Sequence, residues 1–167
     1  NGAPSVAQWN GRGWGQPGTT LDHGSMIFWA LLKRCVPRME LMAATSNNSR
    51  EITLMVFNGN TWGNLVKVTS DDGDRDHRPF YIAYERSSGN GMAVYRDRNN
   101  SNVFYRTWNG SSWSAQQTIT SPLSGKPVFV KLLPKPSSNE IVLVVLDDNS
   151  DLFASVWNGS AWANTVT

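Results

Sequence analysis

The hexapeptide WNGSSW at residues 108–113 recurs in related form along the whole chain. The other copies are WNGRGW at residues 9–14, FNGNTW at residues 57–62 and WNGSAW at residues 157–162. Successive copies are separated by 48, 51 and 49 residues, counted between their asparagines, and together they contain seven of the eight tryptophans. Repetition at such a period is typical of proteins built from stacked supersecondary units, so each interval is predicted to be one structural repeat.

The Asn-Gly pair at the centre of each copy predicts a β-hairpin, because it is the strongest short signal for a tight turn between two strands. With a two-residue loop, both turn positions take positive φ, Trp108 faces Ser111, and Arg106 faces Trp113. The two tryptophans then form a diagonal pair on one face of the hairpin.

The rest of each interval is typical of short strands, since β-branched and aromatic runs alternate with Gly, Asn, Ser and Pro. We expect strands at residues 26–33, 39–44, 52–57 and 61–68, then at 79–86, 92–96, 103–108 and 111–118, and finally at 128–133, 141–146, 152–157 and 160–166. Residues 26–35 could alternatively form a helix, because a short apolar run fits either structure.

The expected strand at residues 152–157 is apolar on both faces. Phe153 and Trp157 share one face, while Leu152, Ala154 and Val156 share the other. A strand of this kind requires cover on both sides, as in a sheet that lies between two other sheets.

Four strands in about 50 residues, with both faces buried, predict the blades of a β-propeller. We therefore predict an all-β fold of antiparallel four-stranded blades in a single repeat domain, residues 1–167. An outer half-blade is expected at residues 1–21, followed by repeats at 22–70, 71–121 and 122–167.

The W-N-G-x-x-W hairpin at this period resembles those of bacterial and fungal propeller lectins of the tectonin-like and fucose-binding types. It is also similar in position to the Asp-box hairpin of sialidase-like propellers, although Asn and Gly are adjacent here, whereas a spacer separates Asp and Gly in an Asp-box. The resemblance covers nearly the whole chain. It implies a fold of propeller blades, with carbohydrate recognition as the expected function of a lectin-like member.

The motif tryptophans are candidate sugar-stacking residues, because a flat π face suits the apolar C–H face of a pyranose ring. The second aromatic of each motif is the stronger candidate, since an amphipathic ring near a blade edge can reach both water and ligand. We take Trp62, Trp113 and Trp162 as ligand-binding candidates, together with Arg106. Core packing and hairpin stabilisation are the alternative role of these tryptophans.

The second repeat is rich in Tyr and Arg, which raises the alternative of a sialidase-like glycoside hydrolase. Such an enzyme needs an arginine cluster that grips a carboxylate, a Tyr–Glu nucleophile pair and an acid. The candidates are Tyr81, Tyr84, Glu85, Arg86, Tyr95, Arg96, Arg98 and Arg106. All of them belong to one repeat, whereas a propeller active site draws its residues from several blades, so the prediction is a protein that is not an enzyme.

Metal and cofactor sites are not predicted. The acidic run at residues 71–76 lacks the spacing of a calcium-binding EF-hand and contains Arg75, which favours a solvated turn. His23 and His77 occupy matching places in two repeats, so repetition explains them without a metal. Cys35 has no second cysteine to pair with and is expected to be a small buried residue.

Composition narrows the classes of partner. The net charge is +2, and the 15 basic and 13 acidic residues are scattered rather than grouped, which argues against a nucleic-acid partner. No stretch approaches the ~18 consecutive apolar residues of a membrane span. Low charge and many Asn, Ser, Thr and Trp residues favour a secreted or cell-surface protein.

The count of strands leaves the first hairpin without inner strands, because only eight residues precede Trp9. An open sheet edge is a template for pairing with another chain, so we expect self-association or a larger polypeptide. The leading functional hypothesis is an extracellular module that binds glycans. The alternatives are a structural or assembly protein joined through open edges and a fragment of a sialidase-like enzyme.

Overall fold

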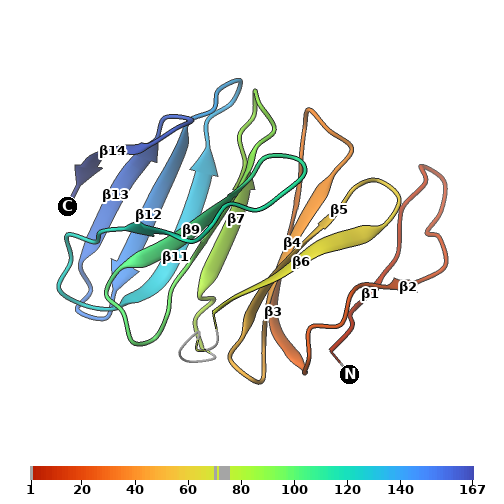
Figure 1. Cartoon of the computed structure of the whole chain (residues 1–167), viewed down its shortest axis with the longest axis horizontal. Helices are drawn as coiled ribbons and strands as arrows, with labels where there is room; N and C mark the ends of the chain where they lie inside the picture. The colour runs from red at the N-terminus through yellow and green to blue at the C-terminus, as the bar shows by residue number, and fades with distance from the viewer. Residues whose placement is uncertain (1, 70, 72–75) are drawn as a thin grey trace.

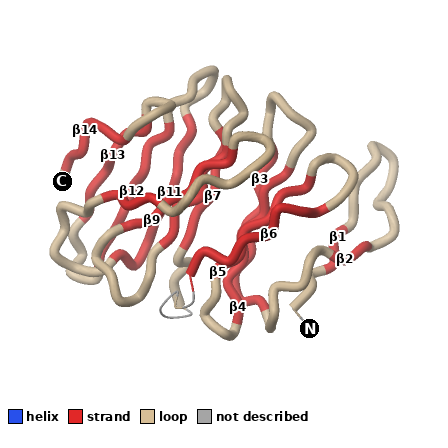
Figure 2. Tube along the Cα trace, viewed as in Figure 1, coloured by secondary structure: helices blue, strands red, loops and turns tan. Residues whose placement is uncertain are grey.

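The computed structural model describes residues 2–69, 71 and 76–167, and within them the regular structure consists of β-strands without helices. Three antiparallel sheets of four strands lie side by side along the molecule, and a two-stranded ribbon lies at the N-terminal end (Figures 1 and 2). The predicted all-β fold of four-stranded antiparallel sheets is confirmed. We call the sheets blades 1, 2 and 3 in chain order.

Neighbouring strands in each blade are also neighbours in the sequence. The ribbon consists of β1 (Ser5–Val6) and β2 (Gly18–Thr19), and blade 1 of β3 (Ile27–Arg34), β4 (Leu41–Asn47), β5 (Ile52–Phe57) and β6 (Trp62–Thr69). Blade 2 consists of β7 (Phe80–Tyr84), β8 (Gly91–Tyr95), β9 (Val103–Trp108) and β10 (Gln117–Ile119), and blade 3 of β11 (Pro127–Pro134), β12 (Ile141–Asp147), β13 (Leu152–Trp157) and β14 (Trp162–Val166).

The expected strand at residues 26–33 is confirmed, and one expected strand of blade 2 is wrong. Residues 27–34 form β3, which pairs with β4, so the helical alternative for residues 26–35 does not hold. The expected strand at residues 111–118 is reduced to a single bridge at Trp113 and the short strand β10. The cause is Ser114, whose hydroxyl and main chain both bond to the main chain of Thr107 and interrupt the regular ladder.

The hairpin loops have four residues, not two, and this corrects the expected cross-strand register. Trp108 lies directly opposite Trp113, Phe57 opposite Trp62 and Trp157 opposite Trp162. The asparagine explains the longer loop, because its side-chain oxygen accepts the main-chain N–H groups two and three residues ahead, at 2.9 Å in the hairpin of Asn109. The two aromatic rings of each motif do share a face, at centroid distances of 5.3 to 5.6 Å.

Only the glycine of each Asn-Gly pair has positive φ, between 97° and 101° in the four motifs. We expect Gly110→Val to lower the free energy of unfolding by more than ~1 kcal/mol, because a β-branched residue is strained at this φ. A Cβ at this position would also approach the Arg38 guanidinium to 3.2 Å. Gly63→Val is the control, since Gly63 lies in β6 with open space around it and without positive φ. Equal urea midpoints for the two variants would contradict this assignment.

Two hydrophobic clusters hold the three blades together. One lies between blades 1 and 2 and contains Met42, Phe80 and Trp108, and the other lies between blades 2 and 3 and contains Met92 and Phe153. Cys35 is fully buried in the first cluster, as expected.

The expectation of burial on both faces is wrong for blade 3. Phe153 and Trp157 are buried against blade 2, whereas Leu152 on the opposite face is 52% exposed. The neighbouring strand β12 shows the same alternation, with Ile141, Leu143 and Val145 buried and the intervening residues partly exposed. The far face of blade 3 is therefore an apolar sheet surface that no described residue of this chain covers.

Candidate functional site

The functional geometry is set by the two ends of the blades. Because the strands are antiparallel and consecutive, the first and third connections of each blade lie at one end, and the second connection lies at the other. The end with the first and third connections carries the W-N-G-x-x-W loops, and we call it the hairpin end. The opposite end, with the second connection, is the turn end. The hydrogen bonds that motif tryptophans make between blades lie at the hairpin end.

A buried carboxylate joins blades 1 and 2 at the hairpin end. Glu40, which precedes β4, is 6% exposed, and its Oε1 accepts hydrogen bonds from the Trp108 indole N–H at 2.9 Å and the Tyr84 hydroxyl at 2.7 Å. The Arg38 guanidinium donates to the same oxygen at 3.2 Å and to the Gly89 carbonyl at 2.6 Å. Three donors from two blades thus compensate one buried negative charge.

The Tyr84–Glu40 pair has the composition of a sialidase-type nucleophile pair, but its environment opposes that role. Burial, and then the hydrogen bond to the Glu40 carboxylate, raise the pKa of Tyr84 far above its usual value. A nucleophilic phenolate needs the opposite shift. Glu85, the other glutamate among the sequence candidates of this repeat, contacts blade 3.

The contact between blades 2 and 3 also contains a buried glutamate that accepts the indole N–H of a motif tryptophan. Glu85 is 3% exposed and accepts the Trp157 indole N–H at 2.6 Å, while the Ser88 hydroxyl donates to its other oxygen. The Arg86 main-chain N–H also donates to the Ser138 carbonyl of blade 3 at 2.9 Å. In both seams, a motif tryptophan of one blade donates to a buried glutamate of the preceding blade.

The structure places the three candidate tryptophans in three separate blades, so they do not meet in one site. Trp113 is half-buried beside Trp108, and its indole N–H donates to the Asn64 carbonyl of blade 1 at 2.9 Å. Trp162 is half-buried with its ring at 5.8 Å from Tyr105 of blade 2. These rings take part in the contacts between blades.

Arg106 lies on β9 and stabilises its own hairpin. Its guanidinium donates to the Ser114 carbonyl at 2.7 Å, across the interrupted ladder. The same side chain lies near the Tyr95 hydroxyl, where burial raises the pKa of the tyrosine and Arg106 opposes that rise.

Trp62 differs from the other two candidates because it lines an open groove of about 350 Å³ between the ribbon and blade 1. Its ring lies 5.3 Å from that of Phe57, tilted by 45°. The groove combines apolar side chains with amides: its lining includes Leu32, Leu41, Phe57, Trp62, Gln8, Gln16 and Asn60. Sequence reasoning missed the two glutamines, since they lie more than 40 residues from Trp62 and belong to no motif.

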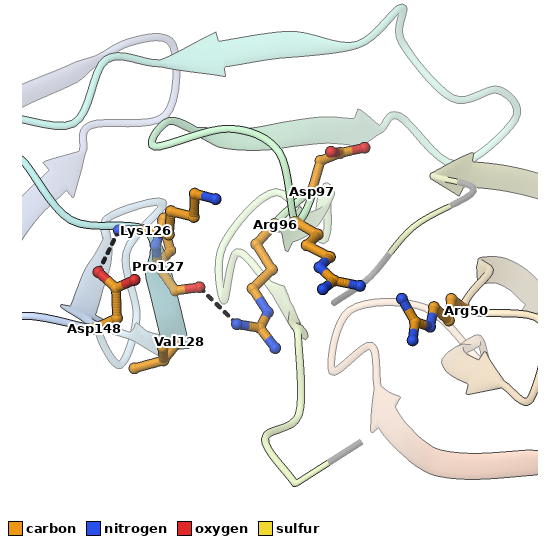
Figure 3. Close-up of a pocket in the computed structure, with 8 residues that line it drawn as sticks. Arg50, Arg96, Asp97, Lys126, Pro127, Val128 and Asp148 are labelled. Carbon is orange, nitrogen blue, oxygen red and sulfur yellow. Dashed lines mark hydrogen bonds between the residues drawn. The ribbon is translucent and has the colours of Figure 1, made fainter. Parts of the chain in front are cut away.

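A second cleft, of about 330 Å³, lies at the turn end and is lined mainly by charged side chains (Figure 3). Arg96 is 5% exposed and donates to the Pro127 carbonyl at 2.8 Å, and the Lys126 main-chain N–H donates to Asp148 at 2.7 Å. Arg50 of blade 1 forms an ion pair with Asp71 at 3.6 Å. Acidic and basic groups are mixed here, so the cleft is a network of polar contacts between blades.

The two histidines, His23 and His77, and the acidic run considered as metal ligands do not form a metal site where the structure describes them. His23 is buried, and its Nδ1 lies 2.6 Å from the Thr45 hydroxyl; burial lowers its pKa, which Asp22 opposes. Asp72 and Asp74 of the acidic run lie outside the described residues. Over residues 2–69, 71 and 76–167, no group of three or more His, Cys, Asp or Glu side chains is arranged to hold a metal ion.

The same arrangement of blades occurs in solved structures. A structure of a fungal lectin from Aleuria aurantia, described as a six-bladed β-propeller, matches 99% of this chain and 51% of its own, with 14% identity and a TM-score of 0.62. This chain has the fold of a partial β-propeller. A mutant of the same lectin in complex with α-methyl-L-fucoside matches with the same coverage and identity at a TM-score of 0.61.

A further match is NanB, solved with Optactamide, at 15% identity and a TM-score of 0.54, over 92% of this chain and 25% of NanB. The present chain spans about half the length of the propeller lectins that it matches.

No family model and no curated protein matched the sequence. In the part of the chain that the structure describes, no helix has the length and apolar character needed to cross a membrane.

Proposed function

We propose that this protein is a non-enzymatic module that binds a neutral carbohydrate in the groove beside Trp62. The observation that carries the proposal is the composition of this groove, in which an aromatic ring and aliphatic side chains lie next to three amide side chains. A sugar ring has an apolar C–H face and a rim of hydroxyl groups. The aromatic side chains suit the first feature, and amides, which both donate and accept hydrogen bonds, suit the second.

The chemistry of the groove favours an uncharged ligand. Its lining contains no Asp, Glu, Lys or Arg among the described residues. A sialic acid or a sulfated sugar would bring a negative charge into a site without a cation to pair with it. Solved propellers of similar fold include a lectin bound to a fucoside, which agrees with a neutral sugar as ligand.

Trp113, Trp162 and Arg106 remain proposed ligand residues of the neighbouring repeats. All three are half-buried, and each also holds a contact within or between blades. We therefore expect substitution of these residues to change stability as well as binding. Trp62 is the residue at which the two effects separate best, because its exposed surface faces the groove.

The comparisons with lectins also support a binding role rather than catalysis. For a glycan-binding module of this composition, we propose an extracellular location. The buried Tyr84–Glu40 pair supports the same view, since neither group is placed as a reactive nucleophile.

We expect Trp62→Ala to weaken carbohydrate binding at least tenfold while the protein remains folded. The measurement is a glycan array with wild-type protein, followed by calorimetric titration of the best neutral sugar. Gln16→Ala should weaken binding without removing the stacking surface, and Leu65→Ala, at an exposed position that does not line the groove, is the control. Unchanged affinity of Trp62→Ala for a sugar that the wild-type protein binds would refute the groove as the site.

A further inference from the structure

The contact between blades 1 and 2 is made by two surfaces, and residues at equivalent positions form a similar pair of surfaces on the outside of the molecule. The donor half of this contact is the Trp108–Trp113 pair, and the acceptor half is Glu40 with the apolar face of blade 1. The N-terminal hairpin repeats the donor half, because Trp9 and Trp14 lie opposite each other with ring centroids 5.5 Å apart. In this hairpin the rings are 53% and 71% exposed.

The acceptor half recurs on blade 3 at positions 100 residues further along. The loop before β12 closes with a hydrogen bond from Lys135 N–H to the Glu140 carbonyl, just as Cys35 N–H bonds to the Glu40 carbonyl. Glu140 therefore occupies the place of Glu40. Its side chain is 38% exposed, against 7% for Glu40, and it is held by Lys135 and Ser138 instead of a tryptophan.

The sheet face next to Glu140 is apolar and open. Met42 and Val56 face blade 2 from blade 1, and their counterparts on blade 3 are Val142 and Val156. These valines are only partly buried, and Leu133, Leu152 and Val166 of the same blade are 45%, 52% and 64% exposed. An apolar surface of this kind marks a site of protein association.

We propose that a second copy of this chain docks its Trp9–Trp14 hairpin on the Glu140 face of blade 3. The contact reproduces the internal seam: the Trp9 indole N–H donates to the Glu140 carboxylate, and the ring pair covers Val142 and Val156. Because the two surfaces differ, the contact is head to tail, and two such contacts close a ring of two chains.

The proposal is independent of the carbohydrate site, because its test measures mass and not binding of a sugar. We expect light scattering of the purified chain to give twice the mass of one chain. Trp9→Ala removes the indole donor and one ring of the pair, and Val142→Glu places a charge on the acceptor surface, so each variant alone should be monomeric. Met26→Glu, at an exposed position near the turn end, should leave the mass unchanged.

Mixing the two monomeric variants gives the decisive result. One variant retains an intact acceptor face and the other an intact hairpin, so the mixture should recover pairs joined by a single contact. Circular dichroism checks that each variant is folded before mixing. A wild-type chain that is monomeric at every concentration would overturn the proposal and leave this face to another protein. Failure of the mixed variants to associate at concentrations well above those at which the wild-type chain pairs would overturn it as well.

Discussion

Glu40→Ala is expected to lower the free energy of unfolding by about 3 kcal/mol, because it leaves two buried donors without an acceptor. The Trp108 indole N–H and the Tyr84 hydroxyl both bond to Glu40 Oε1 in the native protein. A buried donor that loses its partner costs about 1–3 kcal/mol. The Arg38 guanidinium also loses its carboxylate partner, although it retains the Gly89 carbonyl. Urea unfolding followed by tryptophan fluorescence measures the change.

Two further variants separate the lost acceptor from the lost charge. Glu40→Gln keeps an oxygen at the same place and should cost about 1 kcal/mol, the usual net value of a buried hydrogen bond. Glu51→Ala removes a carboxylate that forms an ion pair with the half-exposed Lys67, and its effect should be below about 1 kcal/mol. If Glu40→Ala unfolded at the same urea concentration as Glu51→Ala, the buried carboxylate would not be what joins the two blades.

Phe153→Ala should lower the free energy of unfolding by about 4 kcal/mol, within the range for a phenylalanine removed from a packed core. Phe153 is fully buried and lies in the cluster that joins blades 2 and 3. Truncation leaves a cavity between two sheets, each of which is held in shape by its own hydrogen-bonded ladder, so collapse around the cavity is restricted. The measurement is again urea unfolding, at one protein concentration for all variants.

The control for this substitution is Leu65→Ala in β6. Leu65 is 42% exposed, so its truncation removes little contact and should change the free energy of unfolding by less than about 0.5 kcal/mol. A loss below about 2 kcal/mol for Phe153→Ala, the lower end for large core truncations, would show that blades 2 and 3 separate or repack easily. The seam would then contribute less to the fold than its burial implies.

Glu40→Ala and Phe153→Ala both test the contacts that fix neighbouring blades relative to each other. The groove beside Trp62 lies against blade 1, whose position relative to blade 2 depends on the Glu40 seam. The open face of blade 3 depends in turn on the seam at Phe153. Stability at these two seams therefore supports both the proposed carbohydrate site and the proposed contact with a second chain.

The sequence by itself determined the strands, the hairpins and their repetition, because these depend on neighbouring residues. Asn109 and Gly110 specify a reversal through a side-chain acceptor and a positive φ, and the short apolar and aromatic run at residues 152–157 specifies a strand. Local chemistry of this kind is legible without the fold. Even here the predicted two-residue loop was wrong, because the Asn109 side chain replaces a main-chain acceptor and lengthens the loop to four residues.

Only the tertiary structure decided which residues meet across the blades. Glu40 lies 68 residues from Trp108 and Glu85 lies 72 from Trp157, and no local pattern marks either glutamate as an acceptor. The groove also depends on the fold, since Gln8 and Gln16 meet Trp62 only when the ribbon lies against blade 1. The reason is physical: strand and turn propensities act over a few residues, whereas burial and hydrogen bonding between sheets depend on how whole blades stack.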